Sequence, residues 1–348
     1  MQVVGLFALE DPPRADSKAL TEKLKALGVR VLMITGDALA TAQAIAARVG
    51  IDGAACAGAQ MRDDISRTME CNVFAGVYPE DKLNLVRALQ SSGRVVGMTG
   101  DGVNDAPALK QAEVGIAVSS ATDVAKASAS LVLTNPGLSD IVAAVETSRR
   151  IYQRMLTYTL NKIIKTVEIG FFLTLGVMLT RELVITPSLI VLLLFTNDFV
   201  TMSISTDNVS FSSTPDRWRI GMLMATGLAL GSLILLLSMG LFEAGVHVLR
   251  LPLGELRTMV FITLVFTGQG AIYLIRERHH FWNSLPGRWM IIATLGDLTI
   301  VALMANRGIL MTPLGANVIV LVAAASVAYL TVLDFLKVAI LRRFKFAW

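Results

Sequence analysis

Charged residues, cysteines and histidines are all scarce in this sequence of 348 residues. Charged residues make up only 17% of the chain against 54% hydrophobic residues, which is too apolar a mixture for an ordinary soluble protein. The two cysteines, Cys56 and Cys71, are too few for a disulfide-rich scaffold, and no metal-ligand spacing surrounds them. We therefore expect two unpaired thiols in a cytosolic domain rather than a disulfide.

Long basic runs are also lacking, and the formal net charge of +4 is modest. We expect the basic residues to lie in cytoplasmic loops of a membrane protein, and we expect no nucleic-acid partner. The opening stretch MQVVGLFALEDPPR has no basic start and only a short apolar segment, so it does not predict a signal peptide. Its alternating pattern predicts a strand over residues 3–9.

Hydrophobic residues are distributed unevenly along the chain. Residues 1–150 carry a normal mixture of charge and alternating hydrophobicity, whereas residues 156–341 contain long runs with few charges. This division predicts a soluble domain followed by a domain that lies in the lipid bilayer.

Residues 1–150 alternate between strand-like and helix-like patterns. Such alternation predicts an α/β fold with a parallel sheet that is covered by helices on both faces. Ligands of such folds bind outside the carboxyl ends of the strands. Further strands are expected at 29–34, 73–77, 94–98, 114–118 and 130–133, and helices at 16–27, 38–49, 79–91 and 105–112.

Two Thr-Gly-Asp triplets, Thr35–Asp37 and Thr99–Asp101, end expected strands. Backbone N–H groups in a Gly-containing turn can hold phosphate oxygens, and a carboxylate there can hold Mg²⁺. Lys82, near the start of an expected helix, could neutralise phosphate charge. A single triplet is more often an ordinary turn, and a lone Lys at such a position is usually solvated. Their combination in one domain indicates a site for magnesium and phosphate.

The stretch TGDGVNDAPAL (99–109) resembles the signature of the P-type ATPases, a branch of the haloacid-dehalogenase-like superfamily. MITGD (33–37), DPPR (11–14) and PEDK (79–82) resemble further motifs of that family and occur in its order. The fold that the resemblance implies is a partial phosphorylation domain with a Rossmann-type parallel sheet. An all-α transmembrane bundle of six helices would follow it.

The resemblance also implies a role for each matching residue. Mg²⁺ is an implied cofactor, as is ATP, although the nucleotide-binding domain has no counterpart in this sequence. The catalytic residues would be Thr35, Gly36, Asp37 and Lys82, of which Lys82 neutralises phosphoryl charge. The metal would be bound by Asp101 and Asp105, and phosphate by Thr99, Gly100 and Asn104. A hinge would be formed by Asp11, Pro12, Pro13 and Arg14.

The chain departs from the family in lacking its nucleophile. The motif DKTGT, whose Asp receives the phosphoryl group, is absent, and the only Asp-Lys pair is Asp81-Lys82. The TGE motif of the actuator domain is absent too. The sequence thus resembles only the C-terminal part of a pump, and the implied partner is an N-terminal half with actuator and nucleotide-binding domains. Because the family reacts through a covalent aspartyl phosphate, we expect no phosphoenzyme on this chain alone.

Apolar stretches long enough to span a membrane dominate the second half. No Gly or Pro interrupts residues 139–169, so a helical stalk is expected to continue unbroken into the first span. Lys and Arg are more frequent in loops on the side of the soluble domain. This bias predicts a multi-pass plasma-membrane protein whose soluble domain and C-terminus are cytoplasmic. The spans are expected at about 157–179, 184–204, 220–242, 257–275, 289–305 and 314–336. The expected domains are a partial phosphorylation domain (1–137), a helical stalk (138–156), a transmembrane domain (157–341) and a cytoplasmic tail (342–348).

Three ionisable residues in the expected spans are candidates for ion transport: Lys165 and Glu168 in the first span and Asp198 in the second. Each costs roughly 2.5–3.5 kcal/mol at a helix centre on insertion scales, so it tends to face a partner or a pathway. One interpretation is a carboxylate that binds and releases the transported ion, and the other is a buried ion pair that orders the bundle. We favour the first for Asp198 and keep both for Glu168.

The stretch TNDFVTMSISTDNV, followed by STPDRW, resembles the proton-pump branch of the family. In that branch Asp198 falls on the single key Asp, and Lys165 falls near the Arg that partners it, which implies H⁺ as the transported cation. Calcium fits less well because Ca²⁺ takes about six to eight oxygen ligands. Two alternatives stay open: a P-type ATPase for another cation (Mg²⁺, Ca²⁺, Na⁺ or K⁺), and a non-catalytic truncated pump that acts as a membrane scaffold or regulator.

Overall fold

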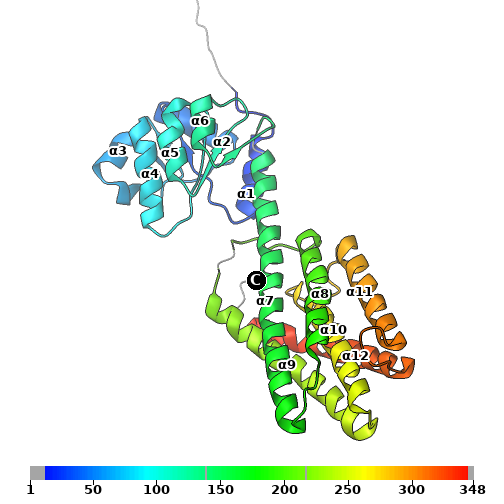
Figure 1. The fold of residues 1–348 in the computed structure, drawn as a ribbon. Helices are drawn as coiled ribbons and strands as arrows, with labels where there is room; N and C mark the ends of the chain where they lie inside the picture. Colours follow the sequence, from blue (N-terminus) through cyan, green and yellow to red (C-terminus); the bar gives the residue numbers. More distant parts are fainter. Residues whose placement is uncertain (1–11, 138, 216–217, 344–348) are drawn as a thin grey trace, which may run out of the picture. The chain divides into compact units, whose positions relative to one another are not determined.

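The computed structural model describes residues 12–137, 139–215 and 218–343 (Figure 1). The chain divides into two compact units. The first reaches Thr147 and includes Ser213–Pro215, and the second comprises the remaining residues from Ser148 onward. The strand expected over residues 3–9 and the hinge residue Asp11 lie outside the described residues.

Over residues 12–137, the strands of the first unit form two parallel sheets of three strands each, with the orders β1-β3-β2 and β4-β5-β6. The expected parallel pairing is confirmed, since Met33 is in register with Val73, and Thr99 with Ile116. β1, which precedes the first Thr-Gly-Asp triplet, and β4, which contains Thr99 and Gly100 of the second, are each the outer strand of a sheet among the described residues. The strands are β1 (Met33–Ile34), β2 (Ala55–Ala57), β3 (Val73–Ala75), β4 (Gly97–Gly100), β5 (Val114–Ala117) and β6 (Leu131–Val132).

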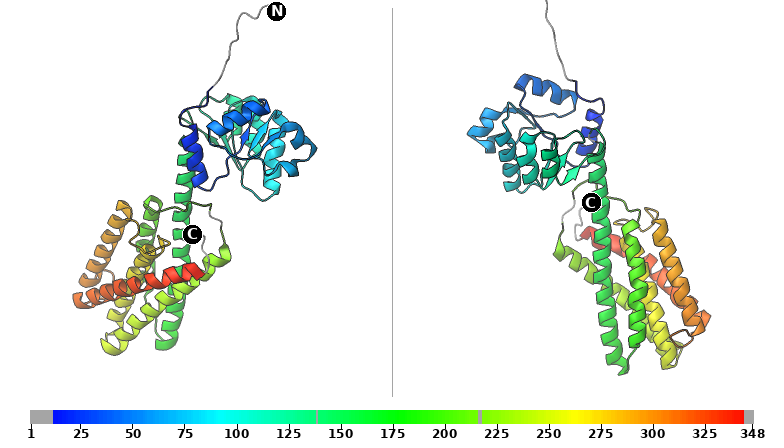
Figure 2. Two further views of the ribbon diagram at one scale, coloured as in Figure 1. Left: turned by 180° about the vertical axis from the view of Figure 1, so that it is seen from behind. Right: turned by 45° about the horizontal axis from the view of Figure 1, so that its top comes forward.

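Helices cover these sheets and bury the apolar side chains. α4 places Leu85 and Leu89 in one cluster with Phe74 of β3. α1 places Leu20 in one cluster with Ile141, at the start of the long helix α7 (Figure 2). The four expected helices are confirmed, whereas α3, α6 and β2 were not anticipated. The helices are α1 (Ser17–Ala26), α2 (Leu39–Arg48), α3 (Gly58–Asp63), α4 (Pro79–Ser91), α5 (Ala106–Gln111) and α6 (Asp123–Ser128).

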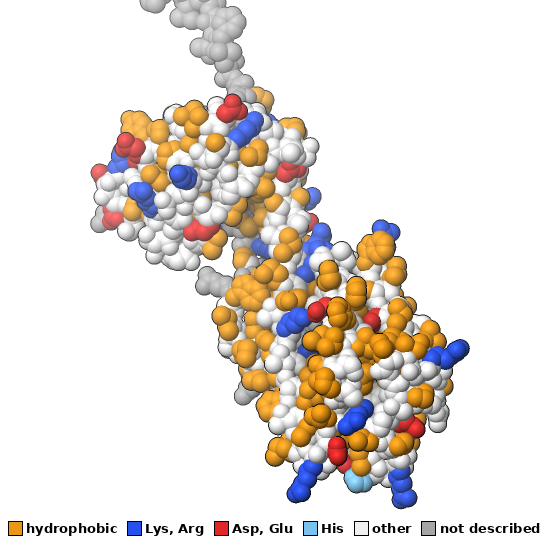
Figure 3. Space-filling model, in the orientation of Figure 1, with side chains coloured by type: hydrophobic (Ala, Val, Ile, Leu, Met, Phe, Trp, Pro, Cys, Tyr) orange, Lys and Arg blue, Asp and Glu red, His pale blue; other side chains and the backbone are white. Residues whose placement is uncertain are grey.

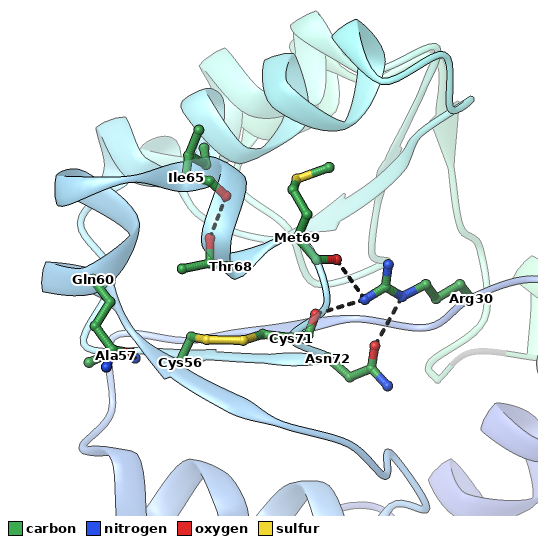
Figure 4. The surroundings of a disulfide bond; sticks show 9 residues. All are labelled: Arg30, Cys56, Ala57, Gln60, Ile65, Thr68, Met69, Cys71 and Asn72. Atoms are coloured by element: carbon green, nitrogen blue, oxygen red, sulfur yellow. Dashed lines mark hydrogen bonds between the residues drawn. A yellow bond between two sulfur atoms is a disulfide. The ribbon is translucent and has the colours of Figure 1, made fainter.

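Cys56 and Cys71 form a disulfide, so the expectation of two unpaired thiols is wrong (Figure 4). Cys56 lies in β2 and Cys71 just before β3, and the pairing of these strands leaves the two Cα atoms 6.0 Å apart, within disulfide range. Arg30 supports the same segment by donating hydrogen bonds to the carbonyl oxygens of Met69 and Cys71 and to Asn72 Oδ1. The spacing of the cysteines does not reveal this strand register.

Among the described residues, six helices are long and apolar enough to cross a membrane. α7 runs over 42 residues, which confirms the expected unbroken helix. α10 is the central helix, because 83% of its apolar window is buried against 22% to 39% for the others. The six helices are α7 (Ser139–Thr180), α8 (Pro187–Ser203), α9 (Ile220–Glu243), α10 (Leu253–Ile275), α11 (Arg288–Arg307) and α12 (Ala316–Arg343).

A small residue brings α9 close to α7. A Cβ on Gly231 would lie 2.9 Å from the Cβ of Val167 and 3.2 Å from the carbonyl oxygen of Ile164. Membrane helices associate by such close packing, because lipid tails remove the hydrophobic driving force between helices. This contact fixes the part of α7 that carries Lys165 and Glu168.

Candidate active site and membrane polar layer

The first Thr-Gly-Asp triplet closes a tight turn after β1. The Thr35 N–H donates to Phe74 O over 2.9 Å, and the Val77 N–H donates to Thr35 O over 3.1 Å, so the β3 segment holds this turn. The Thr35 hydroxyl donates to Asp37 Oδ2 at 2.7 Å and accepts from the Asp37 N–H at 3.1 Å. The turn is therefore already formed, with Gly36 exposed between the two side chains.

The second triplet is held in place by Asp105, which is 5% exposed. Asp105 ends a short 3-10 helix, η2 (Val103–Asp105). Its Oδ2 accepts from the N–H groups of Asp101 at 3.2 Å and Gly102 at 3.3 Å. A Cβ on Gly100 would lie 2.5 Å from the Asp105 Cβ, so the position requires Gly. The packing of Asp105 thus explains the Gly of this triplet without reference to a ligand.

Lys82 reaches the same loop from the first turn of α4. Its Nζ lies 2.7 Å from Asp105 Oδ1, and the two side chains are only 20% and 7% exposed. Pro79 starts α4, and Asp81 fixes the first turn by accepting from the Tyr78 N–H at 2.9 Å. The ion pair therefore joins two of the sequence motifs, PEDK and TGDGVND.

Other candidate residues lie apart from this pair. Thr99 and Asn104 are exposed, and Pro12, Pro13 and Arg14 precede α1 without regular secondary structure. Within the described part of the chain, no hydrogen bond or ion pair joins the Thr35–Asp37 turn to Lys82 or Asp105. The structure thus connects the second triplet with Lys82 directly, and it leaves the first triplet as a separate turn.

The carboxylates of this region differ in their freedom to bind a metal ion. In the chain as described, no three His, Cys, Asp or Glu side chains converge to hold one. Both oxygens of Asp105 are engaged, by Lys82 and by backbone N–H groups, whereas Asp101 is exposed. Mg²⁺ usually keeps several waters and takes only one or two carboxylates together with phosphate oxygens. The donor set therefore fits a Mg²⁺ held by Asp101 and a phosphate, with Asp105 positioning Lys82.

The second unit, which contains most of the six candidate membrane spans, is called the membrane unit below, and the first the soluble unit. In the membrane unit, Asp198 pairs with Lys162, whereas the family resemblance places Lys165 beside Asp198. Lys162 Nζ lies 3.2 Å from Asp198 Oδ1, and the two side chains are 45% and 63% exposed. Lys165 is buried, and its Nζ donates to Asn197 Oδ1 at 2.5 Å. Successive residues of a helix point about 100° apart. Thr196 and Asn197 are buried, and Asp198, one such step further round α8, is exposed.

Glu168 is 1% exposed and bonds to α9 and α10. Its Oε1 accepts from the hydroxyls of Ser238 and Thr267, both at 2.6 Å, while its Oε2 has no hydrogen-bond partner among the described residues. A buried polar atom without a partner is costly unless a proton or a ligand satisfies it. No sequence motif marks Ser238 or Thr267, because single hydroxyl residues are ordinary in membrane helices.

A buried ion pair ties the end of α10 to the segment after α8. Arg276 donates to Asp207 from Nε at 2.8 Å and from Nη2 at 3.2 Å, and the side chains are 0% and 1% exposed. Arg154 of α7 donates to the Asp207 carbonyl oxygen from Nε at 2.9 Å and from Nη2 at 2.7 Å. The Gly287 N–H donates to Asp207 Oδ1 at 2.7 Å. Asp207 thus links α7, α10 and the start of α11, although no sequence motif marks it.

Parts of the chain are similar to known proteins. Residues 2–113 match the haloacid dehalogenase-like hydrolases. The chain contains a haloacid dehalogenase-like domain. The chain is also 36% identical over 353 aligned residues to a protein of Methanocaldococcus jannaschii that is named as a cation-transporting ATPase. That alignment covers 98% of this chain and 44% of the relative, so the chain spans less than half of the relative's length. Together the haloacid dehalogenase-like domain and this relative support the resemblance to the P-type ATPases.

Proposed function

We propose that the chain is the C-terminal part of an ATP-driven cation pump of the P-type ATPase family, and that the transported cation is H⁺. One observation carries the proposal. Helix α7 contains both Ile141, which belongs to the core of the soluble unit, and Glu168, which is buried in the membrane unit. A helix that is unbroken over 42 residues can transmit a displacement along its length. Such a link is expected where chemistry in a soluble unit drives ion binding in a membrane unit.

Each group beside β1 and β4 has a role in this proposal. Asp101 would hold Mg²⁺, which neutralises phosphate charge when it is bound. Lys82, positioned by Asp105, would contact phosphoryl oxygens through its ammonium group. The Gly36 backbone N–H and the Thr35 hydroxyl would contact them from the first triplet.

The Asp that receives the phosphoryl group, and the ATP-binding site, would come from the N-terminal half of the pump. Among the described residues, the outer strands β1 and β4 each leave one edge unpaired in their sheets, so a strand that carries this Asp could pair beside either triplet. The relative supports this division, because this chain spans only 44% of its length. A cytoplasmic soluble unit and C-terminus at the plasma membrane complete the proposal.

For the cation we favour Glu168 as the binding group, ahead of Asp198. Glu168 is buried and keeps one oxygen unpartnered, whereas Asp198 is exposed and paired with Lys162. A proton needs a single oxygen, while Ca²⁺ needs about six to eight. Lys165 lies one helical turn before Glu168 on α7. Its positive charge close to Glu168 disfavours the binding of a divalent ion there.

The test is ATP-driven transport in membrane vesicles that contain the complete pump. We expect internal acidification on addition of ATP, and we expect Glu168→Gln to abolish it, because the amide cannot take up and release a proton. The control Glu182→Gln, in the exposed loop after α7, should leave acidification unchanged. ATP-driven uptake of Na⁺, K⁺, Ca²⁺ or Mg²⁺ without acidification would contradict the proton assignment. Absence of any ATP-driven uptake would contradict the pump.

A second candidate function is a non-catalytic chain that supports or regulates a pump, because within the described residues both oxygens of Asp105 are satisfied by the protein and no three His, Cys, Asp or Glu side chains converge on a metal ion. In that case the phosphate site of this chain would be unused, and Asp101→Asn would leave transport unchanged. For the pump component we expect Asp101→Asn to abolish transport, because no Mg²⁺ would be held beside the phosphate. This single variant therefore separates the two candidates.

A further inference from the structure

A disulfide closes a loop next to the helix that carries Lys82. Cys56 and Cys71 lie 15 positions apart, and the residues between them, 57–70, are called the cystine loop below. The loop contains α3 and the short 3-10 helix η1 (Ile65–Thr68). A cross-link between the ends of a loop restricts the conformations that the loop can adopt. The disulfide therefore limits where the side chains of the cystine loop can lie (Figure 4).

Arg62 of α3 connects the cystine loop to the first turn of α4. Its Nη1 lies 2.6 Å from Asp81 Oδ2, and its guanidinium carbon lies 4.7 Å from the centre of the Tyr78 ring. The same Asp81 oxygen accepts from the Tyr78 N–H at 2.9 Å, and the Asp81 side chain is 5% exposed. Because Lys82 is the next residue of α4, a displacement of Arg62 would reach Lys82 through Asp81.

The packing between the cystine loop and α4 is incomplete. Met61 belongs to the same apolar cluster as Leu85 of α4. A hollow of about 490 Å³ nevertheless separates the two elements, and it is lined by residues 61–65 of the loop and by Asp81, Asn84 and Ala88 of α4. Protein interiors are otherwise close-packed, and an unfilled space lets one element move without displacing packed side chains. We therefore expect the disulfide, rather than dense packing, to restrain the loop on this side.

The surroundings of the two cysteines permit thiol–disulfide exchange. Charged side chains are scattered over the visible face of the soluble unit, as expected of a unit that lies in water (Figure 3). Cys71 is 4% exposed whereas Cys56 is partly exposed, so an attacking thiolate can approach from the side of Cys56. In the proposed orientation this water is the cytoplasm, where thiols are kept reduced and the disulfides that do form usually sense the redox state.

We propose that Cys56 and Cys71 form a reversible redox site that controls the position of Lys82. In the closed state the disulfide holds Arg62 against Asp81, and Lys82 is paired with Asp105. In the reduced state the cystine loop is released, and the first turn of α4 loses the support of Arg62. The inference rests on the proposed function, which gives Lys82 its role and places the soluble unit in the cytoplasm.

The reductant is a dithiol, and the exchange runs in two steps. One thiolate of the dithiol attacks the Cys56 sulfur, the bond between the two cysteines breaks, and Cys71 leaves as a thiolate that takes up a proton. The second thiolate of the dithiol then attacks the mixed disulfide and releases Cys56, which is protonated in turn. Two electrons and two protons thus pass to the cysteines, and the dithiol becomes a disulfide.

The first experiment equilibrates the full chain, purified in detergent, with mixtures of reduced and oxidised glutathione. N-ethylmaleimide in denaturant then blocks the free thiols, and mass spectrometry counts the blocked cysteines. We expect a closed pair when oxidised glutathione is in excess, and two blocked cysteines at the cytoplasmic ratio, where reduced glutathione predominates. A pair that stays closed at that ratio would be a structural cross-link, and a pair that stays open in excess oxidised glutathione would be no redox site. Either result would overturn the proposal.

The second experiment follows hydrogen exchange of the same full chain before and after reduction by dithiothreitol. We expect the amides of α3 and of the first turn of α4 to exchange about tenfold faster after reduction, because local opening becomes easier. Residues 106–117 of the same unit should be unchanged.

The matched variant Arg62→Gln keeps the disulfide and removes the ion pair to Asp81. In this variant reduction should still release α3, but it should not alter the first turn of α4 any further. The variant Cys56→Ser should exchange like the reduced chain with or without dithiothreitol. An α3 that does not respond to reduction, or an equal response of α4 in Arg62→Gln and the parent chain, would overturn the proposal.

Failure of the redox site and failure of the pump can be told apart, because thiol counts and hydrogen exchange need no ATP. In vesicles that contain the complete pump, reduction should slow ATP-driven acidification by about tenfold, since a displaced Lys82 no longer meets the phosphoryl group. Cys56→Ser should show the slow rate in both states. Release of α3 and α4 without any transport would retain the redox site and reject the pump. Transport that reduction leaves unchanged would retain the pump and reject the control of Lys82.

Discussion

At the scale of single residues, Asp105 shows how one motif position holds both a side chain and the backbone of a loop. Its two oxygens hold Lys82 on one side and the backbone of the Asp101 turn on the other, and its Cβ leaves room only for Gly at position 100. The carboxylate that is engaged in this way is buried, and the one left exposed is Asp101. The motif contains both acids, but only the structure shows that Asp105 is buried and bonded while Asp101 is exposed.

Glu113 provides a pH-dependent prediction at this scale. The Val96 N–H donates to Glu113 Oε2 at 2.8 Å and Gln90 donates to Oε1 at 2.8 Å, and these bonds hold the pKa of this exposed carboxyl below its ordinary value, the backbone bond contributing most. Because the pKa of Glu113 is lower in the folded chain than in the unfolded chain, the charged carboxylate stabilises the fold at pH values above the unfolded pKa. This stabilisation is lost as the pH falls through the folded pKa. Near pH 7, Glu113→Gln should therefore lower the free energy of unfolding by less than about 1 kcal/mol, because the group is exposed. The variant should also unfold at a lower temperature than the parent chain.

The measurement is thermal unfolding of the full chain in detergent between pH 3 and pH 7, values chosen to bracket the ordinary Glu pKa of about 4.3. The difference between Glu113→Gln and the parent chain should shrink toward the acid end, where the parent carboxyl is protonated too. A difference that stays constant across this range would show that the Glu113 charge has no part in it.

At the scale of elements, a buried ion pair and hydrogen bonds hold the segment after α8. Arg276 and Asp207 are fully buried and hydrogen-bonded to each other, and Arg154 of α7 reaches the same Asp207 through its carbonyl oxygen. A buried pair of this kind is costly to break from one side, because the remaining charge loses its partner. The α7–α8–α10 junction is thereby held in one arrangement.

We predict that Arg276→Met lowers the free energy of unfolding by about 3–5 kcal/mol, because Asp207 is left charged and buried. The matched control is the exposed pair Lys25–Asp52, with side chains 38% and 87% exposed. Lys25→Met should cost no more than about 1 kcal/mol. Thermal unfolding of the full chain in detergent measures both. Equal effects of Arg276→Met and Lys25→Met would contradict the structural role given to Asp207.

At the scale of the whole molecule, the order of the parts could be predicted because it is written in local patterns. Hydropathy marks the six spans, strand-end triplets mark Thr35–Asp37 and Thr99–Asp101, and the lack of Gly and Pro marks the unbroken α7. Contacts between elements could not be predicted. The disulfide depends on the β2–β3 register, and the pairing of Asp198 with Lys162 depends on the rotation of α8 about its axis. Neither the strand register nor the rotation of the helix can be read from the spacing of residues in the sequence.

The central claim is that this chain supplies a phosphate site to a pump whose nucleophile is elsewhere. The most direct test incubates the chain, alone and together with the N-terminal half, with [γ-³²P]ATP and locates the label on an acidic gel. We predict no adduct on this chain under either condition, and a hydroxylamine-sensitive adduct on the N-terminal half only when this chain is present with Asp101 intact. Label on this chain, or label on the partner that Asp101→Asn does not reduce, would contradict the account.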